Sequence, residues 1–97
     1  MATYISLVTF TDQGIRNMRD LARRLENADQ TFRSLGAELK DIWLVMGQYD
    51  YVVVSEAPDD ETAARVALAV TSQGNVRTQT FRAFGREEMQ KLVEGLP

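Results

Sequence analysis

The sequence predicts an α+β domain in which a four-stranded antiparallel sheet carries two helices on one face. Four short runs have the β-branched and aromatic composition of strands: Tyr4–Phe10, Leu39–Met46, Tyr51–Glu56 and Val76–Phe84. A helical stretch separates the first run from the second, and another separates the third from the fourth. The loop 47–50 between the second and third runs is too short for anything but a hairpin, so these two strands should be antiparallel neighbours.

The first helix is predicted from the spacing of its apolar residues. These residues follow one another at steps of three or four, which places them on one face of a helix. They are Ile15, Met18, Leu21, Ala22, Leu25, Ala28, Phe32 and Leu35. We expect Thr11 or Asp12 to cap the start, and Gly36 to end the helix in a left-handed conformation.

The second helix is predicted between two breaks in the chain. Pro58 ends the third strand, and the acidic run 59–61 suits a helix start, where carboxylates meet unpaired backbone N–H groups. Its many alanines should let the helix lie close against the sheet, and it should end near Gly74. The apolar spacing of Arg86–Gly95 predicts a short C-terminal helix.

The element order is therefore βαββαβ followed by a C-terminal helix, which predicts the ferredoxin-like fold. The runs 42–46 and 51–54 are apolar at consecutive positions, so neither face of these strands is polar. The two helices can cover only one face of the sheet. We therefore expect the sheet face to be covered by a second copy of the chain, in a dimeric α+β barrel arrangement.

Composition restricts the classes of function. The 97 residues predict a single domain, 1–97, with 44% hydrophobic and 26% charged residues. Without cysteine and histidine, thiol catalysis and the usual transition-metal sites are excluded, and we expect no metal and no cofactor. The net charge of −3 disfavours nucleic acid as a partner. No apolar run reaches the ~20 residues of a membrane span, and no signal peptide is recognised, so a cytoplasmic location is expected.

Two long motifs resemble one known family. The segments 47–60 (GQYDYVVVSEAPDD) and 74–84 (GNVRTQTFRAF), together with the opening segment 11–17 (TDQGIRN), are similar to the GYD domain family of small bacterial proteins. The glycine, tyrosine and aspartate that name the family stand here as Gly47, Tyr49 and Asp50, with Gln48 inserted. The resemblance implies a ferredoxin-like, oligomeric α+β protein, and it implies no catalytic residues.

Six residues are candidates for a ligand site: Trp43, Tyr49, Asp50, Glu56, Arg77 and Arg82. Gly47 and Asp50 bracket the predicted hairpin turn, so a structural role is favoured over an acid–base pair of Tyr49 and Asp50. Glu56 ends an apolar strand, and simple alternation lets at most one of the two arginines share its face. A paired Glu56 and arginine is the favoured interpretation, and a ligand site is the alternative.

Three smaller features have structural interpretations. The acids 59–61 point in different directions from one helical turn, so capping is favoured over a metal cluster. The arginines of the first helix alternate with acids and predict a solvated surface. The aromatic residues of the strands could line a cavity or an interface between sheets, and the interface is favoured. These are Tyr4, Trp43, Tyr51, Phe81 and Phe84.

The sequence thus predicts a self-associating α+β module that oligomerises through its sheet face and has a possible small-molecule ligand. The alternative is a cofactor-independent enzyme of the dimeric α+β barrel type, acting on a small aromatic or polyketide-like substrate. The lack of histidine and cysteine weighs against that alternative.

Overall fold

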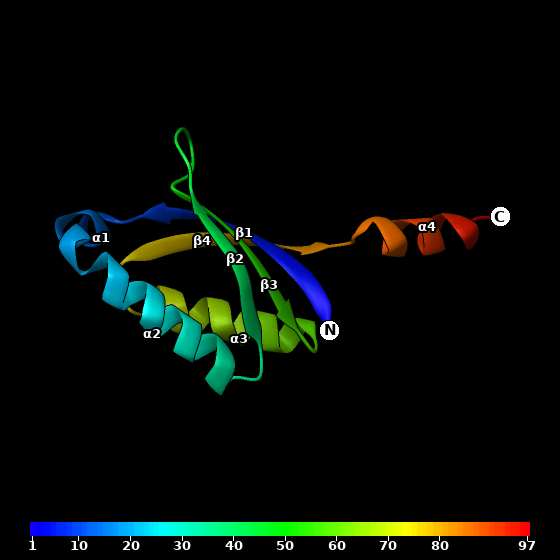
Figure 1. The fold of residues 1–97 in the computed structure, drawn as a ribbon, viewed down its shortest axis with the longest axis horizontal. Coiled ribbons are helices and arrows are strands. Elements are labelled where there is room, and N and C mark those ends of the chain that lie inside the picture. Colours follow the sequence, from blue (N-terminus) through cyan, green and yellow to red (C-terminus); the bar gives the residue numbers. More distant parts are fainter.

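The computed structural model describes residues 1–97 and shows one sheet with two long helices on one side of it (Figure 1). The elements, in order, are β1 (Ala2–Phe10), α1 (Asp12–Arg16), the 3-10 helix η1 (Met18–Asp20), α2 (Leu21–Ser34), β2 (Glu38–Leu44), β3 (Tyr51–Ala57), α3 (Asp60–Thr71), β4 (Val76–Ala83) and α4 (Arg86–Glu94). The strands lie in the order β2-β3-β1-β4, and all neighbours are antiparallel. The predicted ferredoxin-like arrangement is confirmed.

The alternation of side chains along β3 defines the two faces of the sheet. Tyr51, Val53, Ser55 and Ala57 are buried, whereas the residues between them are only partly buried. The pairing of β3 with its neighbours extends this alternation across the sheet, because directly opposed residues point to the same side. We call the side covered by α2 and α3 the helix face and the other side the open face.

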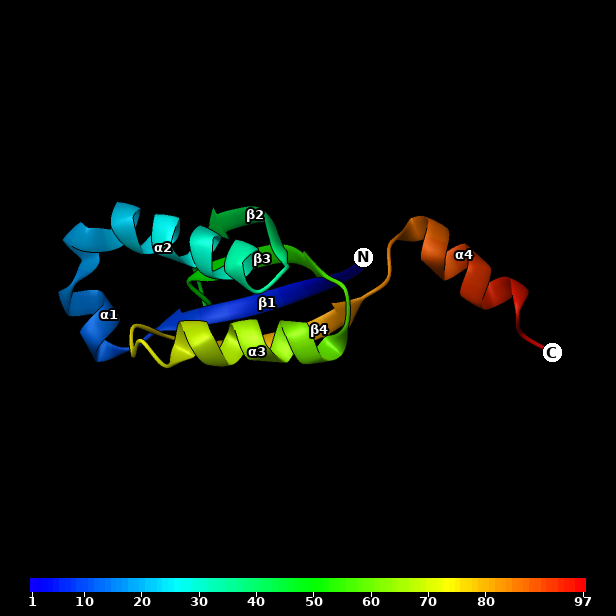
Figure 2. The same cartoon turned by 90° about the horizontal axis from the view of Figure 1, so that it is seen from below.

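The core lies on the helix face. One cluster of buried residues contains Tyr4, Ala37, Ala57 and Val66, and most of the partly buried residues packed against it come from α2, its C-terminal end and α3. A second cluster, Val8, Tyr51 and Val53, lies nearer the start of β3. Figure 2 views this side and shows α2 and α3 running along the sheet.

The single helix predicted over residues 15–35 is wrong, because the chain breaks at Asn17. Asn17 has φ −100° and ψ 28°, and this separates α1 from η1 and α2. Nη1 of Arg24 donates to the carbonyl oxygens of Gly14 (2.9 Å) and Asn17 (3.2 Å), so carbonyl groups at the break have a partner. The predicted cap is confirmed: Thr11 Oγ1 accepts from the backbone N–H of Gly14 at 3.1 Å.

Gly14 lies against the turn that leads into β4. A Cβ atom at this position would stand 2.1 Å from the carbonyl oxygen of Asn75, a contact that backbone movement alone can relieve. We expect Gly14→Ala to lower the free energy of unfolding by roughly 2 kcal/mol or more, measured by urea denaturation. Gly85→Ala is the matched control, because no atom lies within 4 Å of its added Cβ. Equal stability of the two variants would contradict the close approach.

Helix α4 extends away from the rest of the domain, beyond the end of β4 (Figures 1 and 2). The ion pair between Arg82 and Glu88 (3.1 Å) holds its first turn. The predicted C-terminal helix is confirmed. Its apolar side chains, Met89, Leu92 and Val93, are more than half exposed.

Candidate functional site

The open face is mainly apolar at its centre. Ile5 of β1 is paired with Val54 on one side and with Phe81 on the other, and Val52 is paired with Leu7 and Trp43. Trp43 and Phe81 are 51% and 50% exposed, although both are large and apolar. Neither α2 nor α3 covers this face (Figure 1). The apolar strand surface that the two helices cannot cover, as the sequence predicts, therefore lies on the open face of the sheet.

Charged residues lie at two diagonally opposite corners of the open face, and Asp41 of the edge strand β2 lies between these corners, opposite Val54. Glu56 is paired with Glu38 of β2 and Thr3 of β1 near one end of the sheet. Arg77 is paired with Thr9 of β1 near the other end. Of the six candidate residues, Trp43, Glu56 and Arg77 thus share the open face, but Glu56 and Arg77 do not meet within the chain.

Arg82 lies on the other side of the sheet and does not pair with Glu56. It is opposite Tyr4, and its guanidinium donates to Glu88 at 3.1 Å and to the carbonyl oxygen of Thr3 at 3.2 Å. The same guanidinium lies 4.3 Å from the ring centre of Phe84. The hydrogen bond from Arg82 lowers the pKa of Glu88. Within one chain, therefore, Glu56 pairs with neither arginine, and the acid that meets Arg82 comes from α4.

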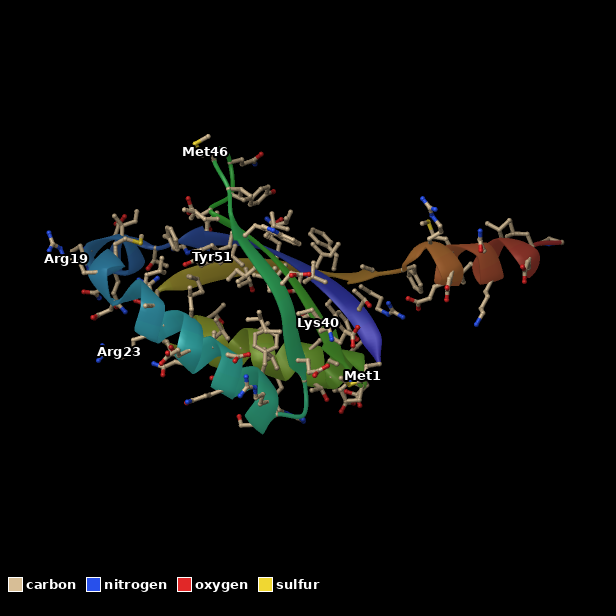
Figure 3. The ribbon with its side chains drawn as sticks, in the orientation of Figure 1. Met1, Arg19, Arg23, Lys40, Met46 and Tyr51 are labelled. Atoms are coloured by element: carbon tan, nitrogen blue, oxygen red, sulfur yellow. The ribbon has the colours of Figure 1, made fainter.

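Tyr49 and Asp50 lie in the loop between β2 and β3, and Asp50 has a structural role there. Its carboxylate Oδ2 accepts from the backbone N–H of Phe10 at 2.8 Å, and its own N–H donates to the carbonyl of Val8 at 2.9 Å. Gly47 has φ +124°, which favours glycine. The favoured turn interpretation is confirmed. The loop projects beyond the sheet, with the fully exposed Met46 at its tip (Figure 3).

The acids at the start of α3 also bind neighbouring groups. Asp59 accepts from the backbone N–H and the hydroxyl of Thr62, at 2.8 and 2.7 Å, and these bonds lower the pKa of Asp59. Asp60 accepts from the hydroxyl of buried Tyr4 at 2.5 Å, and this bond raises the pKa of Tyr4. The capping interpretation of this acidic run is confirmed for Asp59.

The structure also contains a cavity that sequence reasoning did not place. It lies between the helix face, α2 and α3, has a volume of about 100 Å³, and is lined mostly by apolar side chains. Tyr51 lines it and is 7% exposed, and its hydroxyl is buried without a hydrogen-bond partner. Burial raises the pKa of Tyr51. The favoured assignment of all strand aromatics to an interface is therefore wrong for Tyr4 and Tyr51, which lie under the helices.

Fold and surfaces together define a ferredoxin-like α+β domain with one apolar sheet face that its own helices leave uncovered. The chain belongs to the GYD domain family, whose model matches residues 4–93. The resemblance noted in the sequence is confirmed. None of its helices combines the length and the apolar character that crossing a membrane requires.

One curated relative is similar over most of its length. A Thermus thermophilus protein named "Glutamine synthetase and cystathionine beta-lyase binding protein" is 37% identical over 85 residues, which are 87% of this chain and 90% of the relative.

Solved structures support the fold. The feast or famine regulatory protein of M. tuberculosis, complexed with L-methionine, matches with a TM-score of 0.66 and 16% identity over 88% of this chain. This chain spans 51% of that regulator, about half its length. The protein TTHA0845 of Thermus thermophilus matches with a TM-score of 0.55 and 24% identity, over 89% of this chain and 100% of the other.

Proposed function

We propose that the protein is a non-catalytic binding module, which pairs with a second copy of itself through the open face and docks as a dimer on a metabolic enzyme. The observation that carries the proposal is the exposed apolar centre of the open face, with Trp43 and Phe81 half exposed. An apolar face of this kind is stabilised when it leaves water, and aromatic residues dominate the binding energy of protein interfaces.

The charges on the open face favour a second copy as the occupant. In a dimer whose open faces meet across a two-fold axis, the acidic corner of one copy can lie over the basic corner of the other. Arg77 of each copy then lies over Glu38 and Glu56 of its partner, so the contact forms twice. Glu38 and Glu56 also repel each other within one chain, because they are directly opposed, and Lys40, 3.6 Å from Glu38, offsets only part of this repulsion. Arg77 from a second copy relieves that repulsion while the apolar centres of the two sheets meet.

The enzyme partner is proposed from the relative that is 37% identical, whose name describes binding to glutamine synthetase and cystathionine beta-lyase. The exposed side chains outside the sheet face suit such contact. Leu44 at the end of β2 and Met46 on the projecting loop are 70% and 100% exposed, and α4 presents a further apolar stripe.

The alternative of a cofactor-independent enzyme has less support. Asp50 and Glu56, the candidate acids for acid–base chemistry, do not lie together at a cavity. Asp50 binds the backbone N–H of Phe10, and Glu56 lies on the open face. The chain therefore supports binding better than catalysis.

A charge-reversal cycle tests the pairing of copies. We expect Arg77→Glu to weaken self-association about tenfold, because each copy then places acid over acid, and we expect Glu56→Arg added to Arg77→Glu to restore most of it. Analytical ultracentrifugation at micromolar concentration measures both. Arg19→Glu, which reverses an exposed basic residue of η1 away from the sheet, is the control and should leave association unchanged. A wild-type monomer under these conditions would overturn the proposal.

Calorimetric titration tests the enzyme partner separately. The wild-type protein is titrated into purified glutamine synthetase and, in a second experiment, into purified cystathionine beta-lyase. Saturable binding to either enzyme supports the docking role. A dimer that binds neither enzyme would restrict the module to self-association and would overturn the second half of the proposal.

A further inference from the structure

The cavity on the helix face has a polar end and an apolar end. At the polar end, Tyr51 packs edge-on against Phe10, with ring centres 5.0 Å apart, and the guanidinium of Arg24 lies 5.7 Å from the centre of the same Phe10 ring. At the other end, the sheet and helices contribute small apolar side chains, among them Ala57 and Ala63. A molecule that fits must therefore be apolar along its body and polar at one tip.

The hydroxyl of Tyr51 is the reason to expect a ligand and not merely a packing void. A buried hydroxyl without a partner costs free energy, and buried polar groups in native proteins are nearly always hydrogen-bonded. Ser6 and Thr80, which also line the cavity, bind each other at 2.8 Å. Tyr51 is the buried side chain whose polar atom is left without a partner.

The charge of the side chains that line the cavity determines the sign of the charge that a ligand should carry. Arg24 is the one charged side chain in the lining, and only its Nη1 donates to backbone carbonyls. Its other guanidinium nitrogens remain to meet an anion. The Arg24 charge also acts on the Tyr51 hydroxyl, where it partly opposes the effect of burial on the pKa of that group. An oxyanion at this end would accept from Tyr51 and be attracted by Arg24.

We propose that this cavity binds a small organic monocarboxylate, whose apolar body lies between α2, α3 and the sheet and whose carboxylate accepts a hydrogen bond from Tyr51 beside Arg24. The volume of about 100 Å³ restricts the enclosed body to a few carbon atoms. The cavity lies on the opposite side of the sheet from the open face, so this site does not depend on the proposed pairing of copies.

The test uses isovalerate as the probe and isopentylamine as its matched control, because both carry the same branched carbon skeleton and differ in the sign of the charged group. Binding is measured by NMR titration of the backbone amide signals. We expect isovalerate to bind saturably, with the largest shifts along β3 and α3, and isopentylamine to bind at least tenfold more weakly. Isovalerate that produces no saturable shift, or an amine that binds equally well, would overturn the proposal.

Three variants locate the probe. Tyr51→Phe removes one hydroxyl and should raise the dissociation constant for isovalerate roughly tenfold or more. Ala67→Leu fills the cavity and should abolish binding, whereas Ala64→Leu, at an exposed position of the same helix, should leave it unchanged. Unchanged affinity in Tyr51→Phe or in folded Ala67→Leu would contradict the site. If Ala67→Leu fails to fold, the comparison of Tyr51→Phe with the wild type decides.

Discussion

Val53→Asp is expected to unfold the domain, whereas Val54→Asp is expected to leave it folded and to prevent self-association. The two valines are neighbours on β3 but point to opposite faces. Val53 is 6% exposed within the core, and Val54 lies at the centre of the open face beside Ile5. An unpaired carboxylate in the core costs several kcal/mol, which is comparable with the entire stability of a small domain of about 5–15 kcal/mol.

Two measurements separate these outcomes. Far-ultraviolet circular dichroism reports whether each variant folds, and sedimentation reports the mass of the folded one. Ala64→Asp is the control, since it adds the same charge at an exposed position of α3, outside the open face. A folded Val53→Asp would contradict the assignment of faces, and a folded Val54→Asp with the mass of the wild-type oligomer would contradict the role of the open face.

Tyr51→Phe and Tyr4→Phe are expected to change stability in opposite directions, although both tyrosines are buried. Tyr51→Phe removes a hydroxyl without a partner and should raise the free energy of unfolding by about 1–3 kcal/mol. Tyr4→Phe removes a hydroxyl that donates to Asp60 at 2.5 Å and should lower that free energy by about 1–2 kcal/mol. For a domain of this size, 1 kcal/mol shifts the melting temperature by roughly 4–8 °C.

Thermal and urea denaturation of the ligand-free protein measure both effects. The comparison is internally controlled, because the two substitutions remove the same atom from the same residue type on the same face of one sheet. A loss of stability in Tyr51→Phe as large as that in Tyr4→Phe would show that the Tyr51 hydroxyl has a partner in the folded protein.

The pattern of strands and helices could be predicted because local signals agree with the fold. The apolar spacing, the short hairpin and the capping residues Thr11 and Asp59 all lie where the structure has them. The break at Asn17 could not be predicted, since it depends on Arg24 reaching two carbonyl groups across the break. The apolar stripe continues through this point and therefore hides it.

The site was harder to predict than the fold because it depends on which face each strand residue takes. Strand β1 is apolar on both faces, so its alternation does not distinguish the helix side from the open side. The alternating burial of β3 places Tyr51 and Val53 on the helix side and Val52 and Val54 on the open side. The pairing of β1 with β3 then assigns each residue of β1 to a side. Arg82 illustrates the same limit, because its partner Glu88 comes from a helix whose direction no local pattern determines.

Strand β3 is a single extended chain, and it separates the cavity from the open face. Tyr51 and Val53 face the cavity, and Val52 and Val54 leave the same backbone toward the other side. An occupant of one side that favoured a small shift of this backbone would act on the other side directly, because no other element lies between the two. Thermodynamic linkage then requires reciprocity: a molecule that tightens the dimer by some factor is itself held more tightly by the dimer, by that same factor.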